Sequence, residues 1–214
     1  KLNRMREFNY IDETIERNEN PALRIGSVGR SALSTVYLMD CIEGMKQFPD
    51  KIFDLAVVDP PYGIGDKFKG GKTGKMNFNE IVNKDWDKVP SDEYFAELRR
   101  VSKNQIIWGG NYFNLPPTRC FIVWDKIISE NFSLAMAELA WTSFDKLAKI
   151  YKLQVPKNGK IHPTQKPVKL YDWLFHNYAK PNDLILDTHL GSQSSRIAAN
   201  KAGLDFVGFE IDRE

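Results

Sequence analysis

The chain has 214 residues, 42% of them hydrophobic and 27% charged, with a formal net charge of +2. These values are typical of one globular domain, and they exclude a disordered, collagen-like or histone-like chain. Two cysteines, Cys41 and Cys120, are too few for a disulfide framework or a cysteine zinc site, so we expect no metal and a reducing compartment. Because no membrane-length apolar run and no signal-peptide pattern are present, we expect a cytoplasmic protein.

Residues 1–34 are expected to form a charged N-terminal arm, helical over residues 1–20. From residue 35 on, short apolar runs predict seven strands, at 35–38, 55–58, 105–108, 121–124, 138–141, 184–186 and 206–209. Helical periodicity and capping residues predict helices at 91–101, 168–178 and 194–202. Strands that alternate with helices indicate an α/β fold, so we expect residues 35–214 to form one Rossmann-like domain, with a mostly parallel sheet and helices on both faces.

The first candidate site is Asp59-Pro60-Pro61-Tyr62, directly after the strand predicted at 55–58. In an open α/β sheet, ligands bind at the carboxyl ends of the strands. The prolines hold the backbone rigid and remove two N–H groups. A carboxylate, a bare carbonyl and an aromatic ring then suit a planar base that carries an amino group.

The second candidate is a turn between a strand and a helix, Asp187-Thr188-His189-Leu190-Gly191-Ser192. Such a turn lets a ligand approach backbone N–H groups at a helix N-terminus. The next predicted strand ends at Glu210, and an acid there is the expected partner for ribose hydroxyls. The turn lacks the Gly-x-Gly-x-x-Gly fingerprint, so a nicotinamide dehydrogenase is disfavoured.

The third candidate is His162-Pro163-Thr164-Gln165-Lys166-Pro167, at the entry of the helix predicted at 168–178. Thr164 and Lys166 can bind a carboxylate there. A proline-bounded loop with a solvated lysine is the commoner meaning of such a string when it stands alone.

Together, these three strings in this order resemble the β-class amino-directed DNA methyltransferases, which carry a DPPY motif and use S-adenosyl-L-methionine. The resemblance spans about residues 35–212 and implies a circularly permuted topology, in which the strands before Asp40 and Glu210 are neighbours. It implies catalytic roles for Asp59, Pro60, Pro61 and Tyr62. For the cofactor, it implies contacts from Asp40, Cys41, Asp59, Thr164, Lys166, Asp187, His189, Leu190, Gly191, Ser192 and Glu210.

The turn at residues 187–194 departs in part from the family pattern, which reads Asp-Pro-Phe-x-Gly-Ser-Gly-Thr. His189 stands in place of the phenylalanine, and Gln193 stands in place of the second glycine. Glutamine fits this position only if the backbone does not need a positive φ there.

The implied substrate is double-stranded DNA, whose target base must be flipped out of the helix. Tyr62 and Trp124 offer rings for stacking on that base, and lysines are expected on the phosphates. The DNA-binding candidates are Lys67, Lys69, Lys72, Lys75, Trp124, Lys126, Lys149 and Lys152. Sequence recognition is expected from the loop at 63–90 and the segment at 127–160, and the resemblance is also compatible with a homodimer.

The sequence thus predicts transfer of a methyl group from S-adenosylmethionine to the N6 amino group of adenine in DNA, in a restriction-modification or related context. Asp59 favours adenine, because the cytosine-N4 members of the family more often carry serine at that position. Cytosine N4 is the first alternative, and a cofactor-binding but inactive nucleic-acid-binding subunit is the second. A glutamine- or RNA-directed enzyme is disfavoured, since its motif usually begins with asparagine.

Overall fold

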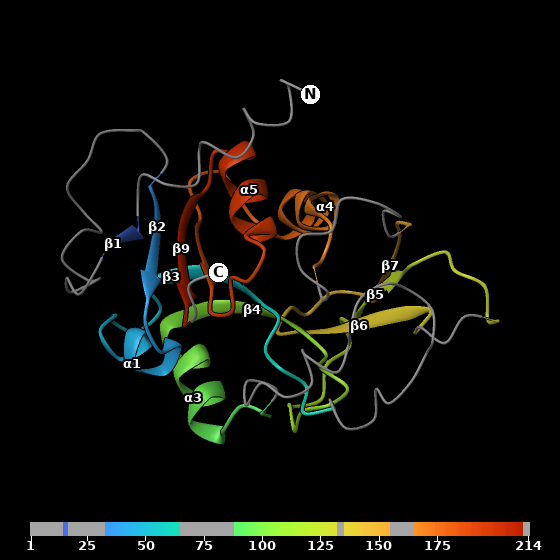
Figure 1. Ribbon diagram of the computed structural model, residues 1–214, viewed down its shortest axis with the longest axis horizontal. Coiled ribbons are helices and arrows are strands. Elements are labelled where there is room, and N and C mark those ends of the chain that lie inside the picture. The colour runs from blue at the N-terminus through green and yellow to red at the C-terminus, as the bar shows by residue number, and fades with distance from the viewer. Residues whose placement is uncertain (1–14, 17–32, 65–87, 132–134, 155–164, 212–214) are drawn as a thin grey trace, which may run out of the picture.

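The computed structural model describes residues 15–16, 33–64, 88–131, 135–154 and 165–211. These residues form one mixed α/β sheet with helices on both faces (Figure 1), in the strand order β1-β2-β9-β8-β3-β4-β6-β5-β7. The strands are β1 (Ile15–Glu16), β2 (Ser34–Leu38), β3 (Phe53–Val58), β4 (Ser102–Trp108), β5 (Ile122–Asp125), β6 (Ala137–Thr142), β7 (Lys149–Lys152), β8 (Leu184–Asp187) and β9 (Asp205–Glu210). The helices are α1 (Cys41–Lys46), α3 (Asp92–Val101), α4 (Val168–Tyr178) and α5 (Ser194–Lys201).

All seven predicted strands are confirmed, but the sheet of the described residues has nine. The two additional strands, β1 and β7, lie at opposite edges, where pairing on one side only leaves a weak sequence pattern. Ile15–Glu16 is a strand rather than part of a helix, and residues 1–14 and 17–32 of the expected arm lie outside the described residues.

The predicted permuted topology is confirmed by the pairing of β2 with β9, two strands that are far apart in the sequence. They are parallel, and Leu38 lies opposite Glu210. The Met39 N–H donates to the Glu210 carbonyl at 2.8 Å, so the pairing continues to the ends of both strands. Asp40 and Glu210 therefore leave the sheet at the same edge.

Two hydrophobic clusters form the core, one on each face of the sheet. In β3, Leu55 and Val57 face the cluster under α4 and α5, whereas Ala56 and Val58 face the cluster under α1 and α3. β3 is thus buried on both faces, as its unbroken apolar sequence predicts. Figure 1 shows the two pairs of helices on opposite sides of the sheet.

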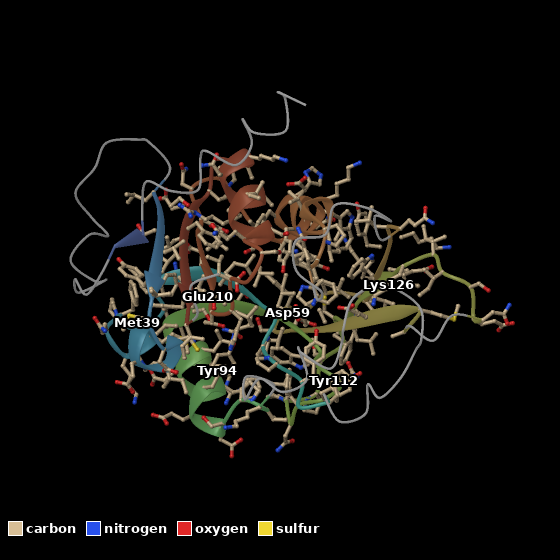
Figure 2. All side chains as sticks on the ribbon, in the orientation of Figure 1. Met39, Asp59, Tyr94, Tyr112, Lys126 and Glu210 are labelled. Atoms are coloured by element: carbon tan, nitrogen blue, oxygen red, sulfur yellow. The ribbon has the colours of Figure 1, made fainter. Side chains whose placement is uncertain are left out.

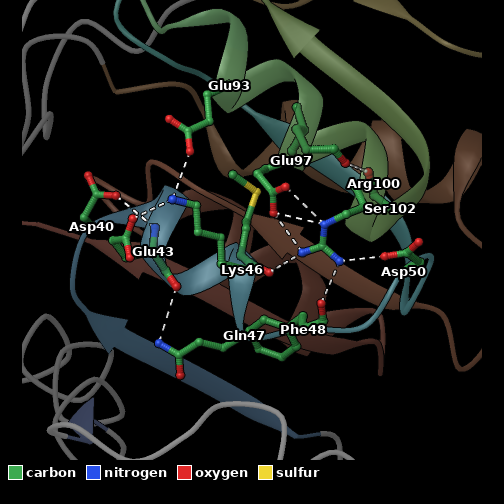
Figure 3. Close-up of polar contacts among 12 residues, drawn as sticks. Asp40, Glu43, Lys46, Gln47, Phe48, Asp50, Glu93, Glu97, Arg100 and Ser102 are labelled. Carbon is green, nitrogen blue, oxygen red and sulfur yellow. Dashed lines mark hydrogen bonds and ion pairs between the residues drawn. The ribbon is translucent and has the colours of Figure 1, made fainter.

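The predicted helices lie at 92–101, 168–178 and 194–201, within one residue of the expected bounds. Ser91 accepts a hydrogen bond from the Tyr94 N–H at 3.3 Å, so it caps α3 as predicted. Arg100, near the end of α3, donates to the Met45 and Phe48 carbonyls at 2.9 Å and fixes α3 against the end of α1 (Figure 3). Within the described part of the chain, no helix is long and apolar enough to cross a membrane.

Candidate active site

The carboxyl edge of the sheet brings the predicted site residues together. Strands β2, β9, β8, β3 and β4 are parallel, so Asp40, Glu210, Asp187, Asp59 and Gly109 all leave the sheet at one edge. Asp59 and Glu210 lie along this edge in Figure 2. Strands that are separated in sequence therefore form one site.

Asp59 is held by two side chains from different parts of the chain. Its Oδ1 atom accepts a hydrogen bond from the Tyr62 hydroxyl at 2.6 Å. Its Oδ2 atom accepts one from the Lys166 ammonium, just before α4. Burial and the negative charge of Asp59 raise the pKa of Tyr62 far above its usual range, so the phenol stays protonated and acts as a donor.

The ring of Tyr62 is also tightly packed. It stacks on Tyr112, with ring centroids 5.0 Å apart and an interplanar angle of 19°. Gly109, with φ of +69°, lies so close to the ring that a Cβ atom at this position would come within 2.2 Å of it. Tyr112 itself is 46% exposed, so the stack opens toward solvent.

The turn after β8 is built by buried polar contacts. Asp187 is 2% exposed and accepts hydrogen bonds from the Ser195 hydroxyl at 2.5 Å and the His189 N–H at 3.1 Å. The Thr188 hydroxyl lies 2.7 Å from the Tyr94 hydroxyl and 2.9 Å from His189 Nδ1. Burial raises the pKa of Asp187 to about 7 and lowers that of His189 to about 4, so the histidine is neutral at neutral pH.

Glu210 reaches back to this turn from β9. Its Oε2 atom accepts the Gly191 N–H at 2.8 Å, and its Oε1 atom accepts the Ile211 N–H at 2.9 Å. Gly191 has a φ of +46°, and a Cβ atom built on it would meet nothing within 4 Å. The backbone of the turn is therefore open to an approaching ligand.

At Gln193 the backbone does adopt a positive φ, so the condition under which glutamine would fit this position easily is not met. Its φ is +59°, in the left-handed region, at the position before α5. This is the position where the family pattern has its second glycine, so the backbone shape is kept although the residue is not. The glutamine side chain accepts a hydrogen bond from Arg196 at 3.0 Å.

Comparison with known proteins shows the family. A family model described as DNA methylase (N6_N4_Mtase) matches residues 107–214, half of the chain. The chain belongs to the N6/N4 DNA methylase family. It is therefore an S-adenosylmethionine-dependent DNA methyltransferase.

Two curated relatives extend along most of the methylase. It is 25% identical to the type II methyltransferase M2.MboI of Moraxella bovis, over 84% of this chain and 83% of the relative. It is 22% identical to the putative methylase YubD of Escherichia coli, over 80% of this chain and 82% of the relative.

Solved structures share the fold. The PvuII DNA methyltransferase, described as cytosine-N4-specific, aligns with a TM-score of 0.60 and 14% identity, over 85% of this chain and 83% of that chain. The M1.HpyAVI–SAM complex aligns with a TM-score of 0.56 and 20% identity, over 83% of this chain and 93% of that chain. These likenesses confirm the Rossmann-like fold class.

Two residues predicted in the cofactor pocket have structural roles in the methylase. Asp40 caps α1, and its Oδ1 atom accepts the Ile42 and Glu43 N–H groups at 2.9 and 3.1 Å. Cys41 packs against the core, where burial and the charge of Asp40 raise the pKa of its thiol to about 12. The thiol therefore stays neutral, which excludes a thiolate nucleophile at this position.

The prediction that Trp124 offers a stacking surface is wrong. The residue is 2% exposed, and its indole N–H donates to the Leu153 carbonyl at 2.8 Å. Side chains of β5 alternate between the two faces of the sheet, and Trp124 points into the core, where it packs against Trp108. A base stacks only on an accessible ring, so Trp124 is a packing residue.

The predicted DNA-binding lysines have different surroundings. Lys126 is paired with Glu138 at 2.6 Å, and its side chain is 14% exposed. Lys149 donates to Asn177 at 2.8 Å and begins β7, at the amino edge of the sheet. Lys152 ends β7 at the carboxyl edge, and its side chain is 71% exposed. Thr164, Lys67, Lys69, Lys72 and Lys75 lie outside the described residues.

The sequence did not indicate three residues that contact the partners of Asp59, Tyr62 and Lys166. Tyr112 stacks on Tyr62, Glu138 lies 3.1 Å from Lys166, and the Trp108 ring lies 5.3 Å from the Lys166 ammonium. Trp108 Nε1 is, among the described residues, the only buried side-chain nitrogen or oxygen without a hydrogen-bond partner. Tyr112 follows Gly109-Gly110, a turn that could have indicated a loop at the site, whereas Glu138 has no local signal.

Proposed function

We propose that this methylase transfers a methyl group from S-adenosylmethionine to the N6 amino group of adenine in double-stranded DNA. The single observation that carries the proposal is the placement of the Asp59 carboxylate. It lies at the carboxyl end of β3, on the same edge as the turn at Asp187 and the acid Glu210. A methyl acceptor and a nucleoside cofactor can therefore bind side by side.

The residues of the turn fit the cofactor. Gly191 leaves open space over the backbone, and Glu210 offers carboxylate oxygens beside it. Each carboxylate oxygen can accept a second hydrogen bond, so ribose hydroxyls can bind Glu210 without displacing the Gly191 N–H. We assign Leu190, Gly191 and Ser192 to the methionine part and Asp40 with Cys41 to the adenine part of the cofactor. His189, neutral and half-buried, forms a wall of this pocket.

The chemistry of the transfer is mainly positioning. S-adenosylmethionine supplies an electrophilic methyl group on its sulfonium sulfur. An exocyclic amine is a weak nucleophile, because its lone pair is delocalised into the ring. Asp59 and the Pro60 carbonyl accept hydrogen bonds from its two N–H groups. These bonds favour a pyramidal nitrogen with its lone pair directed at the methyl group. Pro61 has no N–H, so it places no donor beside that carbonyl.

A ring is needed to hold the flipped base, and we assign this role to Tyr62. Its hydroxyl bond to Asp59 fixes the ring beside the carboxylate, so stacking and amine recognition are set by one rigid turn. Tyr112 covers one ring face in this structure. We infer that the base takes the place of Tyr112 or enters on the other face.

The alternative substrate is cytosine N4. Asp59 favours adenine, whereas the likeness to the cytosine-N4-specific PvuII enzyme keeps the alternative open. The same geometry serves both bases, since each presents an exocyclic amine on a planar ring. A homodimer and a role in restriction-modification remain predictions from the resemblance.

Nucleoside analysis tests the proposal. The methylase is incubated with unmethylated genomic DNA and S-adenosylmethionine, and the DNA is digested and measured by mass spectrometry. As a control for the loss of a carboxylate away from the site, Asp145→Ala, whose side chain is 83% exposed, should keep the activity of wild type. We expect N6-methyladenine. Detection of N4-methylcytosine instead would identify cytosine as the target base. No methylated base despite cofactor binding would favour an inactive binding subunit.

A further inference from the structure

A chain of four alternating charges runs through the active site. The Lys166 ammonium contacts the Asp59 carboxylate and lies 3.1 Å from Glu138 Oε2. The other oxygen of Glu138 lies 2.6 Å from the Lys126 ammonium. The order is therefore Asp59, Lys166, Glu138 and Lys126, with two negative and two positive charges. The cluster is neutral as a whole, and Lys166 at its centre is 4% exposed at the side chain.

Glu138 reaches this cluster through the antiparallel direction of β6. Because β6 runs against its neighbours, its second residue lies at the carboxyl edge of β4 and β5. Glu138 is opposite Trp124 in the β5–β6 pairing, next to the strand end that carries Lys126. Its carboxylate thus reaches Lys166 from β6, whereas Asp59 reaches it from the end of β3, on the other side of β4 in the sheet.

The burial of Lys166 makes its partners important. A buried ammonium without partners is strongly unfavourable, so the side chain must keep at least one carboxylate. Burial alone would lower the pKa of Lys166, but the charges of Asp59 and Glu138 raise it well above its usual range. Burial alone would likewise raise the pKa of Glu138, but Lys166 and Lys126 lower it. Both groups are therefore charged at neutral pH.

The reaction changes what Asp59 can offer. In the structure, both of its oxygens are engaged, one by Tyr62 and the other by Lys166. The target amine needs acceptor capacity on the same carboxylate, so it must share an oxygen with Tyr62 or with Lys166, or take the oxygen that Lys166 releases. Glu138 is the one other carboxylate within 4 Å of the Lys166 ammonium among the described residues.

We propose that Glu138 is a positioning residue for methyl transfer, one that holds the Lys166 ammonium beside Asp59 and keeps it paired while Asp59 accepts the target amine. This inference rests on the function proposed above. Without Glu138, Lys166 would be bound to Asp59 alone and would compete with the substrate for it. Glu138 therefore affects the rate of transfer through its ion pair with Lys166.

The test measures single-turnover methyl transfer at saturating DNA and S-adenosylmethionine. We expect Glu138→Gln to lower the rate roughly 10- to 100-fold, the loss typical of disturbed positioning. The dissociation constant of the cofactor should change less than about threefold, because the carboxylate acts on Asp59 and Lys166. The matched control is Glu97→Gln, since Glu97 pairs with Arg100 at 2.8 Å on α3 and is structural. Glu97→Gln should lower the melting temperature without slowing transfer.

A double variant separates positioning from a loss of structure. In a Lys166→Met background, Glu138→Gln should slow transfer by less than about threefold further, because its effect passes through the missing ammonium. Since removal of a buried charge can destabilise the fold, Glu138→Asp is the second variant. It keeps the charge and shortens the side chain, and it should fold and still slow transfer.

Three results would overturn the inference. They are a wild-type rate in folded Glu138→Gln, a wild-type rate in Glu138→Asp, or an equal loss from Glu138→Gln with and without Lys166. Each leaves wild-type methylation intact and so differs from failure of the proposed function, in which the wild-type protein itself forms no methylated base.

Discussion

The Tyr62 hydroxyl lies 2.6 Å from Asp59 Oδ1, three residues earlier on the same rigid turn. In the proposed mechanism, this contact joins the ring that holds the base to the carboxylate that accepts the amine. We expect Tyr62→Phe to slow methyl transfer about tenfold, since a hydrogen bond to a charged group is worth roughly 1.5–3 kcal/mol. Tyr62→Ala removes the ring as well and should slow methyl transfer further. Equal rates for wild type and Tyr62→Phe would show that the hydroxyl is not needed.

The positions of two lysines on β7 predict different effects on DNA binding. Lys152 is exposed at the carboxyl edge, the edge that carries the site, whereas Lys149 is bound to Asn177 at the amino edge. Lys152→Ala should weaken DNA binding and reduce the slope of log K against log salt by about 1. Lys149→Ala removes the same charge and should leave the slope unchanged. Fluorescence anisotropy at several salt concentrations measures both, and equal slopes for the two variants would contradict the assignment.

The left-handed backbone at Gln193 predicts a gain in stability. A non-glycine residue in this region costs roughly 1–2 kcal/mol, and its φ is +59°. We expect Gln193→Gly to raise the free energy of unfolding by about 0.5–1 kcal/mol, after loss of the Arg196 contact and of glycine's extra entropy. Asn182→Gly is the control, with φ of +67°, and should gain less because asparagine tolerates this region. Urea unfolding measures both differences, and a Gln193→Gly variant less stable than wild type would contradict this prediction.

Two neighbours in the cofactor turn have opposite effects on stability against pH. Asp187, with a pKa raised to about 7, binds a proton in the native state that the unfolded chain has already released, so its contribution falls as pH rises from about 4 to 7. His189, with a pKa lowered to about 4, stays neutral where the unfolded chain is protonated, so its contribution rises with pH from about 4 to 6.5.

Substitution of either residue should therefore leave only the pH dependence of stability that the other residue contributes. Compared with wild type, the free energy of unfolding of His189→Phe should fall more steeply as pH rises from about 4.5 to 6.5, and that of Asp187→Asn should rise more steeply. Urea titrations across this range measure both slopes. Identical pH profiles for the two variants and wild type would show that neither pKa is shifted.

Much of the site could be predicted because its parts are local in sequence. The tetrapeptide at Asp59 follows a buried strand, and the turn at Asp187 lies between a strand and a helix, so periodicity alone places both at the carboxyl edge. Glu210 follows by the same argument. The structure brings all three together where the strand order requires it.

The rest could not be predicted, because it depends on contacts across the sheet. Glu138 looks like an ordinary polar position of an alternating strand until the antiparallel direction of β6 places it at the site. Trp124 is expected at the site only because its strand resembles the family strand whose aromatic residue borders the target-base pocket, but here its side chain is buried in the core. Strand β7 has no apolar alternation, because its residues at the sheet edge are largely exposed.

The most direct test of Asp59 as the acceptor of the target amine is the variant Asp59→Asn, which keeps the shape of the side chain and removes its charge. Calorimetry should show S-adenosylmethionine binding within about threefold of wild type, because the turn at Asp187 and Glu210 is unchanged. Transfer to adenine in DNA should fall by roughly 100-fold or more, since the amine loses its charged acceptor. Asp59→Asn that forms N6-methyladenine at a rate close to wild type would contradict the account.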